Sequence, residues 1–141
     1  GAFAMSKGNT LETDILNNIF KNTEWPWDAI TDIYVALHTS DPGEAGSQTT
    51  NECAYTSYDR VAVARSAGGW TVAGNQVSNA ALVQFPQCTG GSETATYFSV
   101  GTVDHPGAGQ ILYSGALSAG LAISNGIQPQ FAIGTLVITE D

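Results

Sequence analysis

The sequence predicts an all-β protein, an antiparallel β-sandwich or jelly-roll-like single domain with one N-terminal α-helix. Short segments that alternate apolar and polar residues recur along most of the chain. Turns rich in Gly and Asn separate these segments at intervals of roughly 8–12 residues. Only one segment has helical periodicity, and 141 residues suffice for one domain with a sizeable core.

We expect residues 6–141 to form this single domain, without an internal repeat or an interdomain linker. Met5 is the only methionine, so residues 1–5 are expected to be a cloning remnant followed by the initiator methionine. The first residues, GAFAMSK, lack a charged start followed by an apolar core, so no secretory signal is predicted.

The helix is predicted over residues 10–21. Its apolar residues recur at helical spacing: Leu11, Ile15, Leu16, Ile19 and Phe20. Asn9 followed by Glu12 matches a capping box, in which the Asn side chain would accept a hydrogen bond from the first turn. Such an amphipathic helix either covers one end of the sheet or docks onto another subunit.

The strands are expected in eight segments along the rest of the chain. In order, these cover residues 33–38, 60–65, 70–73, 76–85 (one or two strands), 94–102, 110–117, 119–124 and 128–139. Gly74-Asn75 is a turn signal between two of them. Asn125-Gly126 lies between apolar segments, the strongest short signal for a β-hairpin.

The longest predicted loop, residues 40–51, joins the first two strands. Pro42 fixes one backbone angle, and Gly43 and Gly46 permit turns that a side chain would obstruct. A loop of this length without periodicity is either functional or mobile. The residues that we expect to contact a partner protein lie at its start: Asp41, Pro42, Gly43 and Glu44.

Residues 22–29, NTEWPWDA, form a second candidate contact segment. Pro26 ends the helix, because it lacks a backbone donor and disfavours a helical conformation at Trp25. Trp25 and Trp27 either plug one end of the sandwich or form a platform on which a sugar stacks. A carbohydrate-binding module would use one of these tryptophans or Trp70.

Composition excludes some partners and favours others. The chain has 13 acidic and four basic residues, a formal net charge of −9. Direct nucleic-acid binding needs clustered Lys and Arg, so no nucleic-acid partner is predicted. No apolar run approaches the roughly 18–20 residues that span a bilayer, so no membrane partner is predicted. Charged residues are only 12% of the chain, which leaves neutral β-surfaces for contact with other proteins.

No motif predicts catalysis, a cofactor or a metal site. His38 and His105 stand apart, and the HExxH and CxxC patterns are absent. Asp41, Glu44 and Glu52 are possible calcium ligands, but the alternating oxygen pattern of a calcium loop is missing. The Gly-x-Ser-x-Gly elbow, the phosphate loop and the dinucleotide fingerprint are absent too.

Cys53 and Cys88 are the only cysteines and are far apart in the sequence. They either form a disulfide or remain small buried thiols, which is the commoner outcome. The sequence leaves this choice open.

Two segments carry a family resemblance, LHTSDPGEAG at residues 37–46 and YDRVAVAR at residues 58–65. With GGWTVAGNQVSNAALVQFP and the C-terminal ILYSGALSAGLAISNGIQPQFAIGTLVITED, they make the chain similar to small virion proteins of tailed bacteriophages. The similarity runs from about Ser6 to Asp141. Proteins of this kind are labelled tail-fibre-like, or decorate and cement the head.

The resemblance implies a non-enzymatic structural protein of the virion, made in the host cytoplasm. We expect a homo-oligomer, a dimer or trimer, whose partners are the major capsid protein or other virion proteins. A head decoration protein would stabilise the shell because it binds only the assembled state. The first alternative is a tail or tail-fibre component, and an alternative of another class is a carbohydrate-binding module.

Overall fold

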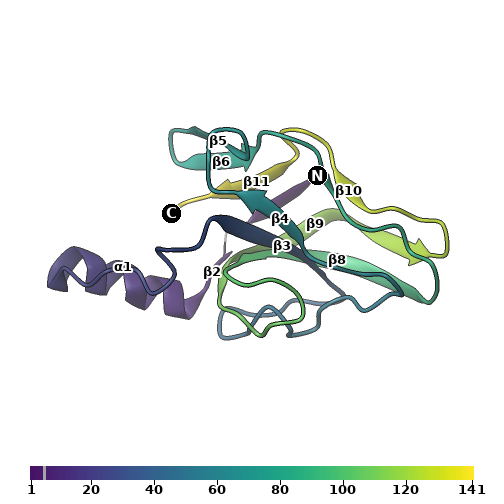
Figure 1. Cartoon of the computed structure of the whole chain (residues 1–141), viewed down its shortest axis with the longest axis horizontal. Helices are drawn as coiled ribbons and strands as arrows, with labels where there is room; N and C mark the ends of the chain where they lie inside the picture. Colours follow the sequence, from purple (N-terminus) through teal and green to yellow (C-terminus); the bar gives the residue numbers. More distant parts are fainter. Residues whose placement is uncertain (5) are drawn as a thin grey trace.

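The computed structural model describes residues 1–4 and 6–141 and confirms an all-β fold with one helix (Figure 1). The helix is α1 (Asn9–Lys21). The strands are β1 (Ala2–Ala4), β2 (Ser6–Lys7), β3 (Asp32–His38), β4 (Val61–Ala64), β5 (Trp70–Ala73), β6 (Gln76–Asn79), β7 (Val83–Gln84), β8 (Ser92–Gly101), β9 (Ile111–Ser124), β10 (Gln130–Phe131) and β11 (Leu136–Thr139).

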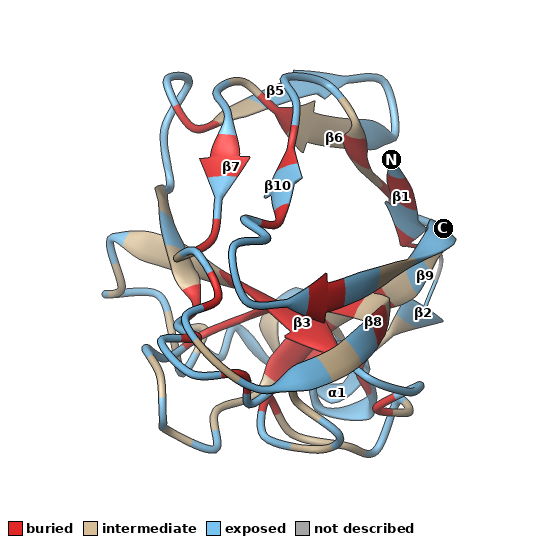
Figure 2. Ribbon diagram, turned by 90° about the vertical axis from the view of Figure 1, so that its right-hand side faces the viewer, coloured by how far each residue is buried: buried red, intermediate tan, exposed pale blue. Residues whose placement is uncertain are grey.

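One curled sheet forms most of the molecule. Its strands follow the order β4-β3-β8-β9-β1-β11-β6-β5, and β2 pairs with β9 beside this path. All neighbours are antiparallel except β1 and β11. The sheet curls so that β5 and β6 lie across the core from β3 and β8 (Figure 2). β7 and β10 form a separate two-stranded ribbon.

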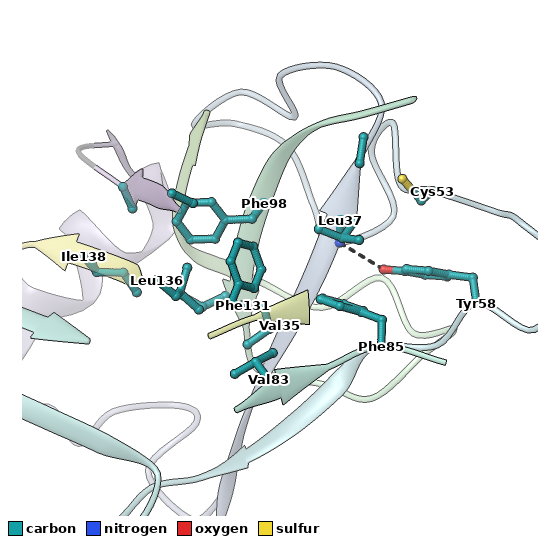
Figure 3. Close-up of a cluster of buried hydrophobic side chains, with 14 of the residues drawn as sticks. Val35, Leu37, Cys53, Tyr58, Val83, Phe85, Phe98, Phe131, Leu136 and Ile138 are labelled. Atoms are coloured by element: carbon teal, nitrogen blue, oxygen red, sulfur yellow. Dashed lines mark hydrogen bonds between the residues drawn. The ribbon is translucent and has the colours of Figure 1, made fainter. Parts of the chain in front are cut away.

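The core lies between the facing parts of the sheet and the ribbon. Phe85, Phe98 and Phe131 meet edge to face, with ring centroids 6.1–6.3 Å apart along the series. Aliphatic side chains from β3, β7 and β11 fill the remaining space (Figure 3): Val35, Leu37, Val83, Leu136 and Ile138. These residues come from segments far apart in the sequence, so the core fixes the curl of the sheet.

The structure places a single strand where the sequence predicts strands at 110–117 and 119–124. Ser118 does not interrupt β9, because its backbone N–H donates to the carbonyl of Gly1 at 2.9 Å. Strand β9 pairs with β8 on either side of a register shift that falls between Leu121 and Ala116, and with β1 and β2 on its other side. It is the central strand of the fold.

The two turn signals have different outcomes. Gly74-Asn75 joins β5 to β6 as an antiparallel hairpin, as expected. The hairpin prediction at Asn125-Gly126 is wrong, because β9 pairs with β8 whereas β10 pairs with β7. The backbone N–H of Gly126 donates instead to the carbonyl of Cys88 at 2.8 Å, so this turn leads the chain out of the large sheet.

The helix begins one residue earlier than predicted, and the capping-box prediction is wrong. Gly8 is the N-cap residue and makes no side-chain cap, so Asn9 lies inside the first turn. A Cβ atom at Gly8 would lie 2.2 Å from the carbonyl oxygen of Ile111. The close approach of α1 to β9 therefore requires glycine at this position.

The segment expected to be a cloning remnant provides β1. Ala2 and Ala4 are buried, and β1 lies between β9 and β11. The origin of residues 1–5 stays a prediction, and Met5 lies outside the described residues.

Candidate contact surface

A buried ion pair holds the long connection between β3 and β4. The Arg60 guanidinium donates from Nε to Glu52 Oε2 at 2.8 Å and from Nη2 to Glu52 Oε1 at 2.9 Å. Arg60 Nη1 donates to the carbonyls of Val103 and Asp104, and the Tyr58 hydroxyl donates to Glu52 Oε2 at 2.7 Å. Each charge is therefore paired and hydrogen-bonded, as buried charges require. The connection is fixed at this end.

His38 ties the same connection to β8. Its Nδ1 lies 2.8 Å from the carbonyl oxygen of Thr50, and its Nε2 lies 2.7 Å from Ser99 Oγ. Because a carbonyl only accepts, Nδ1 carries the proton, and neutral Nε2 then accepts from the Ser99 hydroxyl. Burial lowers the pKa of His38, more strongly than the Thr50 carbonyl raises it. His38 is thus a neutral structural side chain.

Gln48 fixes the middle of the connection. Its side-chain Oε1 accepts from the backbone N–H of Val103 at 3.1 Å, and its Nε2 donates to the Val103 carbonyl at 3.1 Å. Its backbone N–H donates to the carbonyl of Gly109 at 2.9 Å. The side chain is fully buried, so residues 47–60 belong to the body of the protein and the exposed tip is shorter than the predicted loop.

The tip at residues 40–46 contains the first predicted contact residues. Asp41 and Glu44 are exposed, whereas Pro42 is buried and Gly43 is half-buried. The Asp41 carboxylate accepts from the backbone N–H of Gly43 at 2.9 Å, and Gly43 has a φ of +75°. This Asx turn presents two carboxylates from a defined backbone.

Trp25 and Trp27 are half-buried, with ring centroids 5.2 Å apart and planes tilted by 34°. Trp27 Nε1 donates to Asp14 Oδ2 on α1 at 3.3 Å. The guanidinium carbon of Arg65 lies 5.5 Å from the Trp27 ring centroid, a cation–π arrangement. Both rings pack against the core rather than standing free as a platform.

Helix α1 links the two sets of predicted contact residues. The backbone N–H of Asn9 donates to the carbonyl of Glu44 at 2.9 Å, while Asp14 accepts from Trp27. The acidic tip and the tryptophan segment therefore both meet the first turns of the helix. The sequence alone predicts no such link, because it depends on long-range packing.

An apolar groove of about 620 Å³ lies beside this region. Its lining is almost entirely hydrophobic and includes Trp27, Ile33, Trp70, Val72, Val77 and Ile138. Among the described residues, the Trp70 indole nitrogen is the only buried side-chain nitrogen or oxygen without a hydrogen-bond partner. A sugar site needs convergent polar groups, so this groove suits an apolar partner better. The sequence alone does not predict this groove. The only sequence signal for it is that Val72 and Val77 are apolar residues next to polar ones in two short strands.

The residues considered for chemistry do not converge. Within residues 1–4 and 6–141, no group of three or more His, Cys, Asp or Glu side chains is placed to hold a metal ion. Glu52, a possible calcium ligand, is engaged by Arg60 and Tyr58. Cys53 and Cys88 are free and buried, and burial raises the pKa of Cys53 to about 12.

The part of the chain that the structure describes contains no helix that could span a membrane. Its α-helix, α1, is too short and too polar to cross a bilayer.

Comparison with known proteins identifies one family. The family described as podophage GP4 fiber I protein gp80 matches residues 6–139, nearly the whole chain. No curated protein matches the chain. The match agrees with the resemblance to small phage virion proteins, and its description is that of a fibre. The chain therefore belongs to the podophage GP4 fiber I protein gp80 family, a family of structural components of phage particles.

Proposed function

We propose that the protein is a non-enzymatic structural subunit of a podophage tail fibre, made in the host cytoplasm and incorporated into the virion. The observation that carries this proposal is the family match over residues 6–139, since it covers the sheet, the helix and the exposed tip together. The protein binds other virion proteins through surfaces that its fixed loops present.

The fold suits a subunit that must hold a contact surface in one shape. The Glu52–Arg60 pair, Gln48 and His38 anchor the connection that carries the tip. A preorganised surface loses less conformational entropy on binding than a mobile loop. This supports a structural role for the tip.

Decoration of the head is the second candidate, and it rests on the sequence resemblance. A decoration protein would bind the capsid surface in many copies and stabilise the shell. The fibre description of the family supports a tail role at least as well. Location on the particle therefore separates the two roles.

Asp41 and Glu44 are the first contact residues that we propose, because their carboxylates are exposed at the tip. Asp41→Lys and Glu44→Lys should leave the fold intact and reduce incorporation into particles. Asp59→Lys, at an exposed position outside both candidate segments, makes the same change of charge and is the control. Equal incorporation of all three variants would exclude the tip. Trp25→Ala and Trp27→Ala test the second set in the same assay.

Gold-labelled antibody against this chain, imaged on intact particles, tests the proposed location. A fibre subunit predicts a few gold particles at the tail of each virion. Labelling spread over the head would instead support decoration and contradict the proposal.

A further inference from the structure

Strand β1 occupies a slot between β9 and β11 that holds a strand with small side chains. Ala2 and Ala4 belong to the core and are fully buried, whereas Phe3 between them is 60% exposed. β1 runs parallel to β11 and antiparallel to β9, so it meets a neighbouring backbone on both sides. The slot therefore binds the backbone of its occupant and takes small side chains at alternate positions.

The β9 wall of the slot is adapted to a closely packed strand. A Cβ atom at Gly115 would lie 2.0 Å from the carbonyl oxygen of Phe3 and 2.7 Å from the Cα atom of Ala4. Glycine at this position is what allows a strand to lie so close to β9. The family match covers residues 6–139, which include Gly115 and both walls of the slot, whereas β1 lies before the matched range. The walls are thus a feature of the family, and the strand that fills them here is not.

A pocket of about 200 Å³ continues the slot beyond Gly1. Leu121 of β9 lines it, together with Leu37, Phe85 and Phe131 of the core (Figure 3). None of the described side chains that line it is charged. A cavity of roughly 150 Å³ with such a lining can hold benzene, so this pocket has room for one large apolar side chain.

The edge of β9 beside the pocket is free. Ser118 donates its backbone N–H to the carbonyl of Gly1 at 2.9 Å, and β1 reaches no further along β9. In the part of the chain that the structure describes, no strand pairs with residues 119–124 on this side of β9. A strand that extended β1 upstream would place its next residue opposite Ala119, which lines the pocket. Because side chains alternate along a strand, that residue would point to the same side as Ala2, into the pocket.

We propose that the slot and the pocket together form an acceptor site for one extended segment of another virion protein, and that β1 occupies only part of this site. The segment is uncharged and has the pattern large apolar–x–small–x–small. Its large side chain fills the pocket, and its two small side chains take the positions of Ala2 and Ala4.

Two observations favour an extended segment as the occupant. The pocket is continuous with the interface between β1 and β9, which already holds a strand. Backbone hydrogen bonds to β9 and β11 supply affinity, and the pocket supplies specificity, as in other cases where a strand is added to a sheet. The choice of a virion protein as the donor rests on the structural role proposed above.

A peptide tests the acceptor site on the full-length chain. In the Ala2→Glu/Ala4→Glu double variant, β1 cannot bury its charged side chains and should leave the slot. The labelled peptide acetyl-SLGAFA-amide should bind this variant at least tenfold more tightly than the wild type, whose own β1 competes with it. If the double variant does not fold by itself, the same peptide should restore the β-sheet signal in circular dichroism.

The matched control is the peptide acetyl-LSGAFA-amide. It has the same composition, but its leucine points away from the pocket, so it should bind at least tenfold more weakly than the first peptide. Equal affinity of the two peptides, or neither binding nor refolding with the first one, would overturn the inference.

Photo-crosslinking in assembled particles identifies the donor. A diazirine analogue of leucine at Leu121, in the pocket, should crosslink to a different virion protein, and mass spectrometry should find the large apolar–x–small–x–small pattern at the crosslinked segment. The same analogue at the exposed Leu82, outside the pocket, should not capture this segment. Crosslinks only within the chain or to a second copy would overturn the inference. A donor from the phage head would refute the fibre role while supporting the acceptor site.

Discussion

At the scale of single residues, the contact between Arg60 and Glu52 decides the shape of the connection from β3 to β4. Both side chains lie inside the protein, and their side-chain exposures are 0% and 8%. The Arg60 guanidinium also reaches the segment that contains Val103 and Asp104. One ion pair therefore joins two connections that lie far apart in the sequence.

Arg60→Ala should lower the free energy of unfolding by about 3–5 kcal/mol, because it leaves the Glu52 carboxylate buried without a counter-charge. Urea denaturation measures this loss. Lys7→Ala breaks the more exposed pair with Glu140 and should cost at most about 1 kcal/mol. A similar small loss in both variants would show that the buried pair is not a structural anchor.

His38 should make the protein less stable in acid. Burial lowers its pKa in the folded state below the ordinary value of 6.5, so the unfolded chain binds the proton more readily. The free energy of unfolding therefore falls as the pH drops below about 6.5, by at most about 1.4 kcal/mol per pH unit for this one group. The His38→Gln variant should lose less stability between pH 7 and pH 5 than the wild type. Urea denaturation at both pH values measures these losses. If the wild type and the His38→Gln variant lose the same free energy of unfolding between pH 7 and pH 5, His38 does not have this role.

At the scale of secondary-structure elements, the start of α1 shows how backbone contacts override local sequence signals. Gly8 donates its backbone N–H to the carbonyl of Leu112 at 2.9 Å, which holds the helix start against β9. The Asn9-Glu12 pattern predicts a cap one residue later. Close backbone packing selects glycine there instead.

Gly8→Ala should destabilise the protein by about 1–3 kcal/mol, because the new methyl group must displace the Ile111 carbonyl 2.2 Å away. Thermal denaturation compares it with Gly68→Ala. The nearest atom to a Cβ at Gly68 is 3.6 Å away, an ordinary contact, so that variant should be neutral or slightly stabilised. If both variants melt together, α1 does not depend on this close approach.

Alternation and turn residues predict much of the secondary structure. The helix is predicted to within one residue at its start, and β3, β5 and the β5–β6 turn lie where the sequence places them. The patterns do not predict that β9 runs through Ser118, or that β10 pairs with β7. Those features depend on which strands meet across the sheet, and local periodicity carries no information about such pairing.

The candidate contact surface is predictable only in part for the same reason. Turn residues single out Asp41 and Glu44, and both are exposed. Their connection to α1 and the groove around Trp70 arise from contacts between distant segments. Leu16, Ile19 and Phe20 can be recognised as an apolar face from the sequence, but only the structure shows that the chain leaves this face uncovered.

At the scale of the whole molecule, the buried body of the curled sheet is distinct from the surfaces that we propose for contact. Buried residues from β3, β8, β9 and β11 fix the body, whereas α1 projects from it (Figure 1) and the tip carries the exposed Asp41 and Glu44. If the proposed surfaces are contacts, a subunit with this fixed body can bind more than one neighbour at once. This is the property that a fibre component requires.

The most direct test of the fibre role measures where the protein goes when particles are taken apart. Heads and tails are separated by sedimentation, and mass spectrometry compares the amount of this chain with the major capsid protein and the tail proteins. A fibre subunit should remain with the tails, in few copies per particle. Recovery with the heads, in numbers close to those of the capsid protein, would contradict the account.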